Sequence, residues 1–152
     1  AVFVRDGIFD LLDRNCRALS GKLLIDISNP FNADYSDFVT PWDTSAAEQL
    51  QHRFPQARVV GAFKNVFWEV FDHPDFGETL SDVLVTGDDE KAKAQFFALT
   101  EGTPFRYLDA GPLIHSRTVE RLTFITSSLG RQLHSYPRMN WRLLTQPEQV
   151  AA

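Results

Sequence analysis

The apolar positions of this chain follow two alternating patterns: short continuous runs, and longer runs in which they recur every three or four residues. Short runs rich in Val, Leu, Ile and Phe indicate strands that are covered on both faces. Apolar residues at helical spacing indicate amphipathic helices. On this basis five strands are expected, over residues 2–4, 22–28, 58–63, 82–86 and 105–108.

Four helices are expected, over residues 6–19, after Ser45, after Asp89 and after Ser116. Ser45 and Glu48 have the spacing of a capping box, in which each residue satisfies a free amide of the first turn. The last helix carries an apolar stripe that ends at Leu133. Residues 64–81 are rich in aromatic side chains and are predicted to be irregular, with room for one short helix. Strands that alternate with helices of this length are typical of βαβ crossovers, so we predict an α/β fold with a mainly parallel sheet and a C-terminal helix.

Charge and cysteine content narrow the class of protein. A net charge of -5 gives no indication of nucleic acid or an anionic membrane as a partner. Cys16 has no second cysteine to pair with, which fits a reducing compartment such as the cytoplasm. No apolar run approaches the roughly 20 residues of a membrane span, and no signal peptide precedes the first predicted strand. The chain opens within the apolar run Ala1–Val4, which is typical of a fragment or a processed chain.

Three predicted strand ends carry residues able to contact a ligand, because open parallel sheets bind ligands where their strands end. Asp26–Pro30 ends in Asn-Pro, which can present backbone groups to a flat ligand but also forms ordinary turns. Gly61–Phe67 combines small residues with a Lys-Asn pair, and it can equally be a packing glycine beside a surface lysine. Asp109–Arg117 leads by a Gly-Pro turn into a helix whose amides favour an anion, although Ser116 can serve simply as a cap.

Other residue types argue against several kinds of site. The histidines lack metal-site spacing and no second cysteine supports them, so no metal site is predicted at His52, His73, His115 or His134. Ser127 and Ser128 lie in a predicted helix without a G-x-S-x-G elbow, which argues against a hydrolase. One aromatic group is more typical of a core or dimer surface than of a cofactor platform: Phe63, Phe67, Trp68, Phe71 and Phe76.

Three motifs together resemble those of a known family. Asp109–Glu120 (DAGPLIHSRTVE) is similar to the motif that follows the last strand in NADPH-dependent deazaflavin (coenzyme F-420) reductases. Val85–Asp89 with its Lys- and Ala-rich helix resembles the same family. So does the DxSNP strand end paired with Ser45–Glu48, and this pairing also resembles the oxidoreductase domain of the STEAP metalloreductases. The resemblance covers roughly Val2 to Leu133.

The resemblance implies an incomplete Rossmann-like fold and a reductase in which a hydride passes between NADP(H) and a second ring cofactor. That cofactor would be the deazaflavin coenzyme F-420 or a flavin. Residues 1–144 would be the C-terminal portion of a Rossmann-type NADP oxidoreductase domain, and residues 145–152 a polar tail. Such a reaction requires aligned rings and exclusion of water, so no catalytic acid or base is assigned. Small-molecule cofactors are the expected partners, with a homodimer as a further possibility.

By the same resemblance, nine residues would surround the two rings. Asn29 and Pro30 would lie beside the nicotinamide. The cleft for hydride transfer would be lined by Phe63, Lys64, Asn65 and Val66. The second ring would contact Leu113, in a loop oriented by Ser116 and Arg117, which could also meet an anionic group.

The sequence departs from the family in three respects. It contains no G-x-G-x-x-G, the fingerprint that the family carries ahead of the strand at Val2 and that cradles a pyrophosphate. Lys64 stands where His or Asn is expected, which leaves the second cofactor open, and the loop at residues 31–42 is long. The alternative function is therefore a non-catalytic, degenerate Rossmann module for dimerisation or binding. A β-hydroxyacid-type dehydrogenase is a third option, but it requires a catalytic Lys before a defined helix, which the sequence does not supply.

Overall fold

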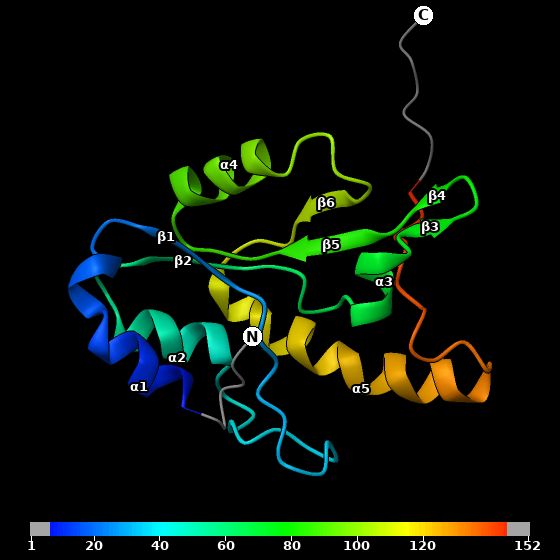
Figure 1. Ribbon diagram of the computed structural model, residues 1–152, viewed down its shortest axis with the longest axis horizontal. Coiled ribbons are helices and arrows are strands. Elements are labelled where there is room, and N and C mark those ends of the chain that lie inside the picture. The colour runs from blue at the N-terminus through cyan, green and yellow to red at the C-terminus, as the bar shows by residue number, and fades with distance from the viewer. Residues whose placement is uncertain (1–6, 146–152) are drawn as a thin grey trace, which may run out of the picture.

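Two pairs of parallel strands form the centre of the computed structural model, which describes residues 7–145 (Figure 1). An antiparallel bridge joins the pairs, because Gly61 and Thr86 exchange two N–H···O bonds of 2.9 Å. The first pair is β1 (Leu23–Asp26) with β2 (Arg58–Gly61), and the second is β5 (Asp82–Val85) with β6 (Arg106–Asp109). The bridge lies at the end of both pairs, so the carboxyl ends of all four strands face one another in the middle of the molecule.

The prediction of an α/β fold with mainly parallel strands is confirmed, with one correction. Strand direction reverses between β2 and β5, because the segment between them is no crossover helix. It contains only α3 (Trp68–Asp72) and a hairpin of β3 (Asp75–Phe76) and β4 (Thr79–Leu80) around Gly77, which has a φ of 66°. The chain therefore re-enters the centre from the opposite side.

Helices cover both faces of the strands (Figure 1). Two of them, α2 (Ala46–Arg53) and α5 (Ser116–Gln132), lie on one face, and α4 (Glu90–Leu99) lies on the other. The helix expected over residues 6–19 is divided into α1 (Ile8–Arg14) and η2 (Cys16–Leu19), which pack beside α2. The expected strand at residues 2–4 lies outside the described residues.

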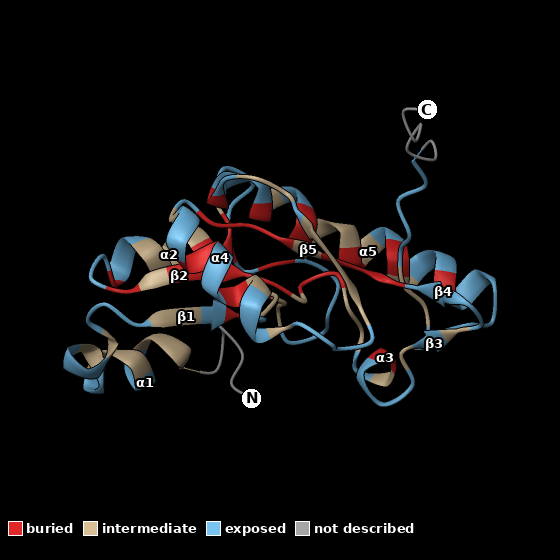
Figure 2. Cartoon of the chain, turned by 90° about the horizontal axis from the view of Figure 1, so that it is seen from above, coloured by how far each residue is buried: buried red, intermediate tan, exposed pale blue. Residues whose placement is uncertain are grey.

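β2 divides the core into two clusters. Its neighbours Val59 and Val60 point to opposite faces, as successive strand residues do. Val59 packs with α2, around Leu50 and Phe54, whereas Val60 packs with α4, around Phe96. Figure 2 shows the buried residues gathered along β2 and β5 and on parts of these helices.

The predicted helix starts are partly confirmed. The Ser45 hydroxyl accepts a hydrogen bond from the Glu48 amide at 3.1 Å, and the Asp89 carboxylate accepts from two amides of α4. The prediction that Ser116 caps α5 is wrong. A 3-10 turn, η3 (Leu113–His115), runs directly into α5, so Ser116 is already inside the helix and its hydroxyl bonds to Thr86 instead.

The segment after α5 returns along the strands to β5. The Asp82 amide donates to the Trp141 carbonyl at 2.9 Å, and the Asp82 carboxylate accepts from the Leu143 amide at 2.7 Å. No helix within residues 7–145 is long and apolar enough to cross a bilayer. The same residues contain no grouping of three or more His, Cys, Asp or Glu side chains suited to a metal ion.

Candidate functional site

The junction of the strand ends depends on a glycine. A Cβ at Gly61 would lie 2.6 Å from the Thr86 hydroxyl oxygen and 3.0 Å from the Ser116 hydroxyl oxygen. These hydroxyls are 2.6 Å apart, and both residues are buried. Only a residue without a side chain therefore lets β2, β5 and α5 approach this closely, and the interpretation of Gly61 as a packing glycine is confirmed.

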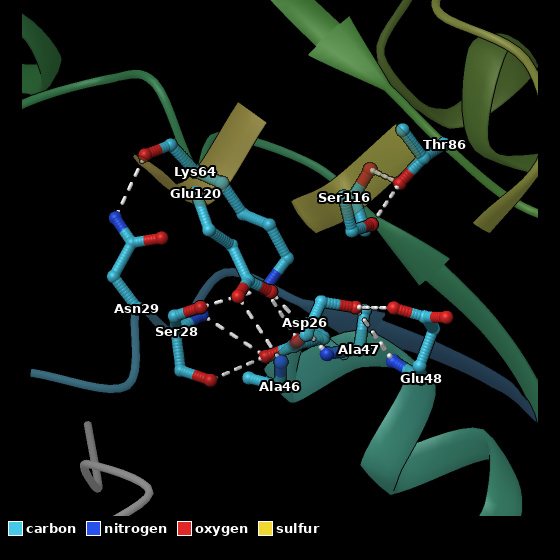
Figure 3. Close-up of polar contacts among 12 residues, drawn as sticks. Asp26, Ser28, Asn29, Ala46, Ala47, Glu48, Lys64, Thr86, Ser116 and Glu120 are labelled. Carbon is cyan, nitrogen blue, oxygen red and sulfur yellow. Dashed lines mark hydrogen bonds and ion pairs between the residues drawn. The ribbon is translucent and has the colours of Figure 1, made fainter. Parts of the chain in front are cut away.

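A buried ion cluster lies immediately beside this junction (Figure 3). The Lys64 ammonium is 2.6 Å from the Asp26 carboxylate at the end of β1 and 2.9 Å from the Glu120 carboxylate on α5. All three side chains are 1% exposed. The alternative interpretation of Lys64 as a surface lysine is therefore wrong. Sequence reasoning missed Glu120, although a glutamate directly after Val119 of the apolar stripe is a signal for a buried, paired carboxylate.

The charges of this cluster stabilise one another. Burial by itself would lower the pKa of Lys64, but the carboxylates of Asp26 and Glu120 raise it above its ordinary value. Lys64 therefore keeps its proton. Burial raises the pKa of Glu120 although Lys64 opposes the shift. The Glu120 oxygens also accept from the Ala46 and Ala47 amides, at 3.1 and 3.3 Å, so the cluster includes the N-terminus of α2.

Lys64 and Asp26 also fix the chain that follows β1. The Lys64 ammonium donates to the Ser28 carbonyl at 2.6 Å, which uses its third donor. The Asp26 carboxylate accepts from the Ser28 amide and hydroxyl, at 3.0 and 2.6 Å. The Asn29 side-chain NH₂ donates to the Lys64 carbonyl at 2.8 Å. Asn29 thus bridges two strand ends, which an ordinary turn would not require.

A pocket of about 680 Å³ opens beside this loop, within the range of about 300–1,000 Å³ typical of small-molecule sites. Its walls come from the end of β1, the loop after it, the segment before α3, and one face of α5. The lining residues are Ile8, Ile25, Asp26, Ile27, Ser28, Asn29, Phe31, Asp34, Tyr35, Val66, Phe67, Trp68, Thr123, Ser127, Arg131 and Tyr136. Nine of these sixteen residues are aliphatic or aromatic, and the other seven are polar or charged.

Two of the nine predicted site residues, Asn29 and Val66, line this pocket. The Asn29 side-chain oxygen is shielded from solvent, and no described residue donates a hydrogen bond to it. Pro30 is buried beside the pocket, and its carbonyl accepts from the Val39 amide at 2.7 Å. Lys64 lies behind the pocket wall, in the ion cluster.

The other five predicted residues lie in the core or pair elsewhere. Phe63 packs edge-on against Phe96 and Phe105, and Leu113 is 2% exposed in the α2 cluster. Asn65 holds β5, since its oxygen accepts from the Leu84 amide and its NH₂ donates to the Asp82 carbonyl. Ser116 bonds to Thr86, and Arg117 pairs with Glu48 at 2.6 Å. A role of these five in cofactor binding stays a prediction.

The structure adds pocket residues that sequence reasoning did not select. Thr123, Ser127 and Arg131 follow one another every four residues along α5, so they form one face of that helix, and Tyr136 follows shortly after it. This row of polar residues lies beside the apolar stripe of the same helix, and its spacing in the sequence could have identified these residues as one face of a site. The predicted aromatic group divides, because Phe67 and Trp68 line the pocket while Phe63 and Phe71 contact each other outside it.

No family profile matches this chain, but individual proteins do. An F420-dependent NADP reductase of Methanocaldococcus jannaschii is 34% identical over 110 residues, which are 69% of this chain and 49% of that protein. The metalloreductase STEAP3 of Rattus norvegicus is 33% identical over 105 residues, 68% of this chain and 20% of that protein. The chain thus spans about half or less of the curated relatives it matches.

Two solved structures agree with these matches in fold. A candidate F420-dependent NADP reductase from Arthrobacter sp. superposes with a TM-score of 0.75 at 26% identity, over 84% of this chain and 60% of the other. An uncharacterised protein from Sinorhizobium meliloti gives a TM-score of 0.58 at 22% identity, over 69% of this chain and 53% of the other, and shows the fold alone. The resemblance found from the strand-end motifs and the Rossmann-like assignment are confirmed.

Proposed function

From its relationship to the F420-dependent NADP reductases, we propose that this chain holds the second ring cofactor of an NADP-dependent oxidoreductase during hydride transfer. Residues 1–144 would be the C-terminal portion of that domain, with a polar tail at residues 145–152. The nicotinamide of NADPH supplies a hydride, and the acceptor ring takes up this hydride together with one proton from solvent. A deazaflavin is the acceptor that the relatives' names favour over a flavin.

The pocket at the end of β1 is the observation that carries this proposal. Its apolar walls, among them Ile27 and Trp68, suit the faces of a flat aromatic ring and exclude water from it. The Asn29 oxygen, to which no residue of the described range 7–145 donates, offers a buried acceptor for an N–H at the edge of such a ring. A buried acceptor without a donor is unfavourable, so a ring N–H placed there would gain a hydrogen bond that residues 7–145 do not make.

The ion cluster positions this acceptor. Lys64 holds the Ser28 carbonyl with its ammonium and the Asn29 side chain with its own carbonyl. Asp26 and Glu120 fix the ammonium in turn. Because hydride transfer depends on the alignment of two rings, rigid placement of a contact residue contributes to rate without any proton transfer by the protein.

The described residues fit a ring better than a whole dinucleotide. The 152 residues contain no G-x-G-x-x-G, so the chain offers no glycine-rich cradle of that kind for a pyrophosphate. We therefore assign the pocket to the acceptor ring, with the nicotinamide meeting it at the Asn29 side. A cytoplasmic location and a homodimer remain predictions.

Titration of the chain with a ribityl deazaflavin, followed by deazaflavin fluorescence, tests the assignment. Saturable binding that weakens in Asn29→Ala, but not in the control Asn15→Ala on an exposed turn, is expected. No binding of the ring by the folded chain would overturn the proposal.

Turnover is then measured with NADPH and the deazaflavin, from the absorbance of both. Ring binding with NADPH oxidation supports the oxidoreductase. Ring binding without turnover would favour the non-catalytic binding module for these 152 residues.

A further inference from the structure

The pocket has one cationic end. Arg131 is the only lysine or arginine among the residues that line it. Its guanidinium carbon lies 4.8 Å from the centre of the Tyr136 ring, a cation–π distance. The Tyr136 ring packs edge-on against Trp68 and Phe67, with centroid distances of 5.6 and 5.9 Å. These three rings therefore hold the guanidinium of the exposed Arg131 against the pocket.

The Arg131 charge is not neutralised within the pocket. No described residue accepts a hydrogen bond from its guanidinium, which leaves its donors available. The Asp34 carboxylate, the acid on the opposite loop, already accepts from the Ser36 amide and hydroxyl, at 3.2 and 2.7 Å. The Asp26 carboxylate is bonded by Lys64. An anion beside Arg131 would meet a cation that no residue in the described range 7–145 pairs with.

The face of α5 sets the distance between the two ends of the pocket. Thr123 is buried, one turn after Glu120 of the ion cluster that holds Asn29, whereas Arg131 is exposed two turns further along the same face. Eight residues of helix separate them by about 12 Å, on the order of the length of a tricyclic ring. A ring that lies along this face with one edge at Asn29 would direct its substituent toward Arg131.

We propose that Arg131 binds the phosphate on the side chain of the acceptor ring, and that the site thereby selects phosphorylated rings over the same rings with a neutral chain. This inference rests on the proposed function, since it takes the acceptor ring to occupy the pocket. Arginine suits the role because its planar guanidinium binds phosphate with two parallel hydrogen bonds.

The test compares a ribityl deazaflavin with its monophosphate, both followed by ring fluorescence. The unaltered chain is expected to bind the monophosphate about five- to tenfold more tightly, the scale of one charge-assisted pair at a partly screened site. Arg131→Gln should remove that preference, so that the monophosphate and the neutral ring bind this variant with equal affinity. Arg17→Gln, the same change at an exposed arginine outside the pocket, should leave the preference intact. The preference should also shrink as salt is added.

The outcomes separate this inference from the proposed function. Equal affinity for the two rings, or a preference that persists in Arg131→Gln, overturns the phosphate assignment while ring binding stands. Failure of both rings to bind overturns the ring assignment and the inference with it. In a last comparison, the binding of reduced nicotinamide mononucleotide is measured beside that of its unphosphorylated riboside. An Arg131-dependent preference in that pair alone would assign the phosphate to the hydride donor and refute the inference.

Discussion

Two ion networks hold the two halves of the strand arrangement, and they differ in how much water reaches them. Lys64 lies between two carboxylates, and all three side chains are 1% exposed. Asp82 lies between two guanidiniums, those of Arg106 and Arg142, whose side chains are 27% and 34% exposed. The first network thus has two carboxylates for one cation and is shielded from water, so we call it the dry network. The second has two cations for one carboxylate and is partly hydrated, so we call it the wet network.

This difference indicates different tasks. In a dry network no solvent can replace a lost partner, so every member fixes the others in one arrangement. The Lys64 network therefore determines where the loop beside the pocket lies. In the wet network water can take the place of a lost partner. The Asp82 network anchors the returning segment through the Leu143 amide, away from the pocket.

The largest effect is expected for Lys64→Met. It leaves Asp26 and Glu120 buried without a cation, which costs about 3–5 kcal/mol of unfolding free energy. Urea unfolding measures this loss, and ring binding should be lost with it. Lys93→Met is a matched control, since the Lys93 side chain is only 5% exposed but its partners Asp109 and Glu90 are 45% and 80% exposed. Equal losses for the two variants would contradict the distinction between dry and wet networks.

A smaller effect is expected for Asp82→Asn. It removes the charge that Arg106 and Arg142 share, at a cost of about 1–2 kcal/mol because both guanidiniums remain partly hydrated. Urea unfolding should show this loss, and fluorescence titration should show unchanged ring affinity. A loss of ring affinity in the folded variant would mean that this network also positions the pocket.

The two networks should respond to acid with opposite signs. Burial alone would raise the pKa of Asp82, but the Arg106 guanidinium and the Leu143 amide lower it below its ordinary value. Its contribution to stability is present above its unfolded-state pKa of about 4 and is lost as pH falls through the lower folded value. Burial raises the pKa of Glu120, so its contribution is present below its unfolded-state pKa and is lost as pH rises through the folded value.

Urea midpoints measured from neutral pH to pH 3 check these signs. The stability gap between the unaltered chain and Asp82→Asn should narrow as the pH falls. As the pH falls, the stability of the unaltered chain relative to Glu120→Gln should instead increase. If the urea midpoints of both variants ran parallel to those of the unaltered chain over this pH range, the opposite pKa shifts assigned to Asp82 and Glu120 would be refuted.

The smallest effect is expected for Arg117→Gln. Its pair with Glu48 joins α5 to α2, but the two side chains are 33% and 21% exposed. Partly exposed pairs contribute little, because solvent screens the attraction and two long side chains are immobilised. We expect urea unfolding and ring binding close to those of the unaltered chain. A marked loss of ring binding would instead support the prediction, made from resemblance, that Arg117 orients a cofactor loop.

Local sequence patterns predicted most of the helices and strands. They failed where contacts between segments far apart in the sequence determine the structure. The capping spacing at Ser45 and the acid at Asp89 locate two helix starts, because a cap is satisfied within its own first turn. Ser116 has the same type of side chain, but the preceding 3-10 turn and the nearby Thr86 hydroxyl give it another partner. The reversal of strand direction at Gly61 likewise depends on how the segment after β2 folds, and its composition does not show this.

A small part of the pocket could be predicted from the sequence. Asn29 and Val66 lie in two of the strand-end stretches, the family resemblance assigned them to the site, and both line the pocket. Arg131 and Tyr136 follow no strand, and they reach the pocket because α5 lies along it. A residue on a helix face is assigned to a site only when the partner of that face is known.

By itself, the sequence determined the order of the main strands and helices and the strand-end motifs that reveal the family. These follow from periodicity and from residues that act on their immediate neighbours. Only the tertiary structure decided that Lys64 would be a buried partner of Asp26 and Glu120 instead of a surface charge. Its environment is assembled from β1, α2 and α5, and the cost of burying a charge depends on those distant partners.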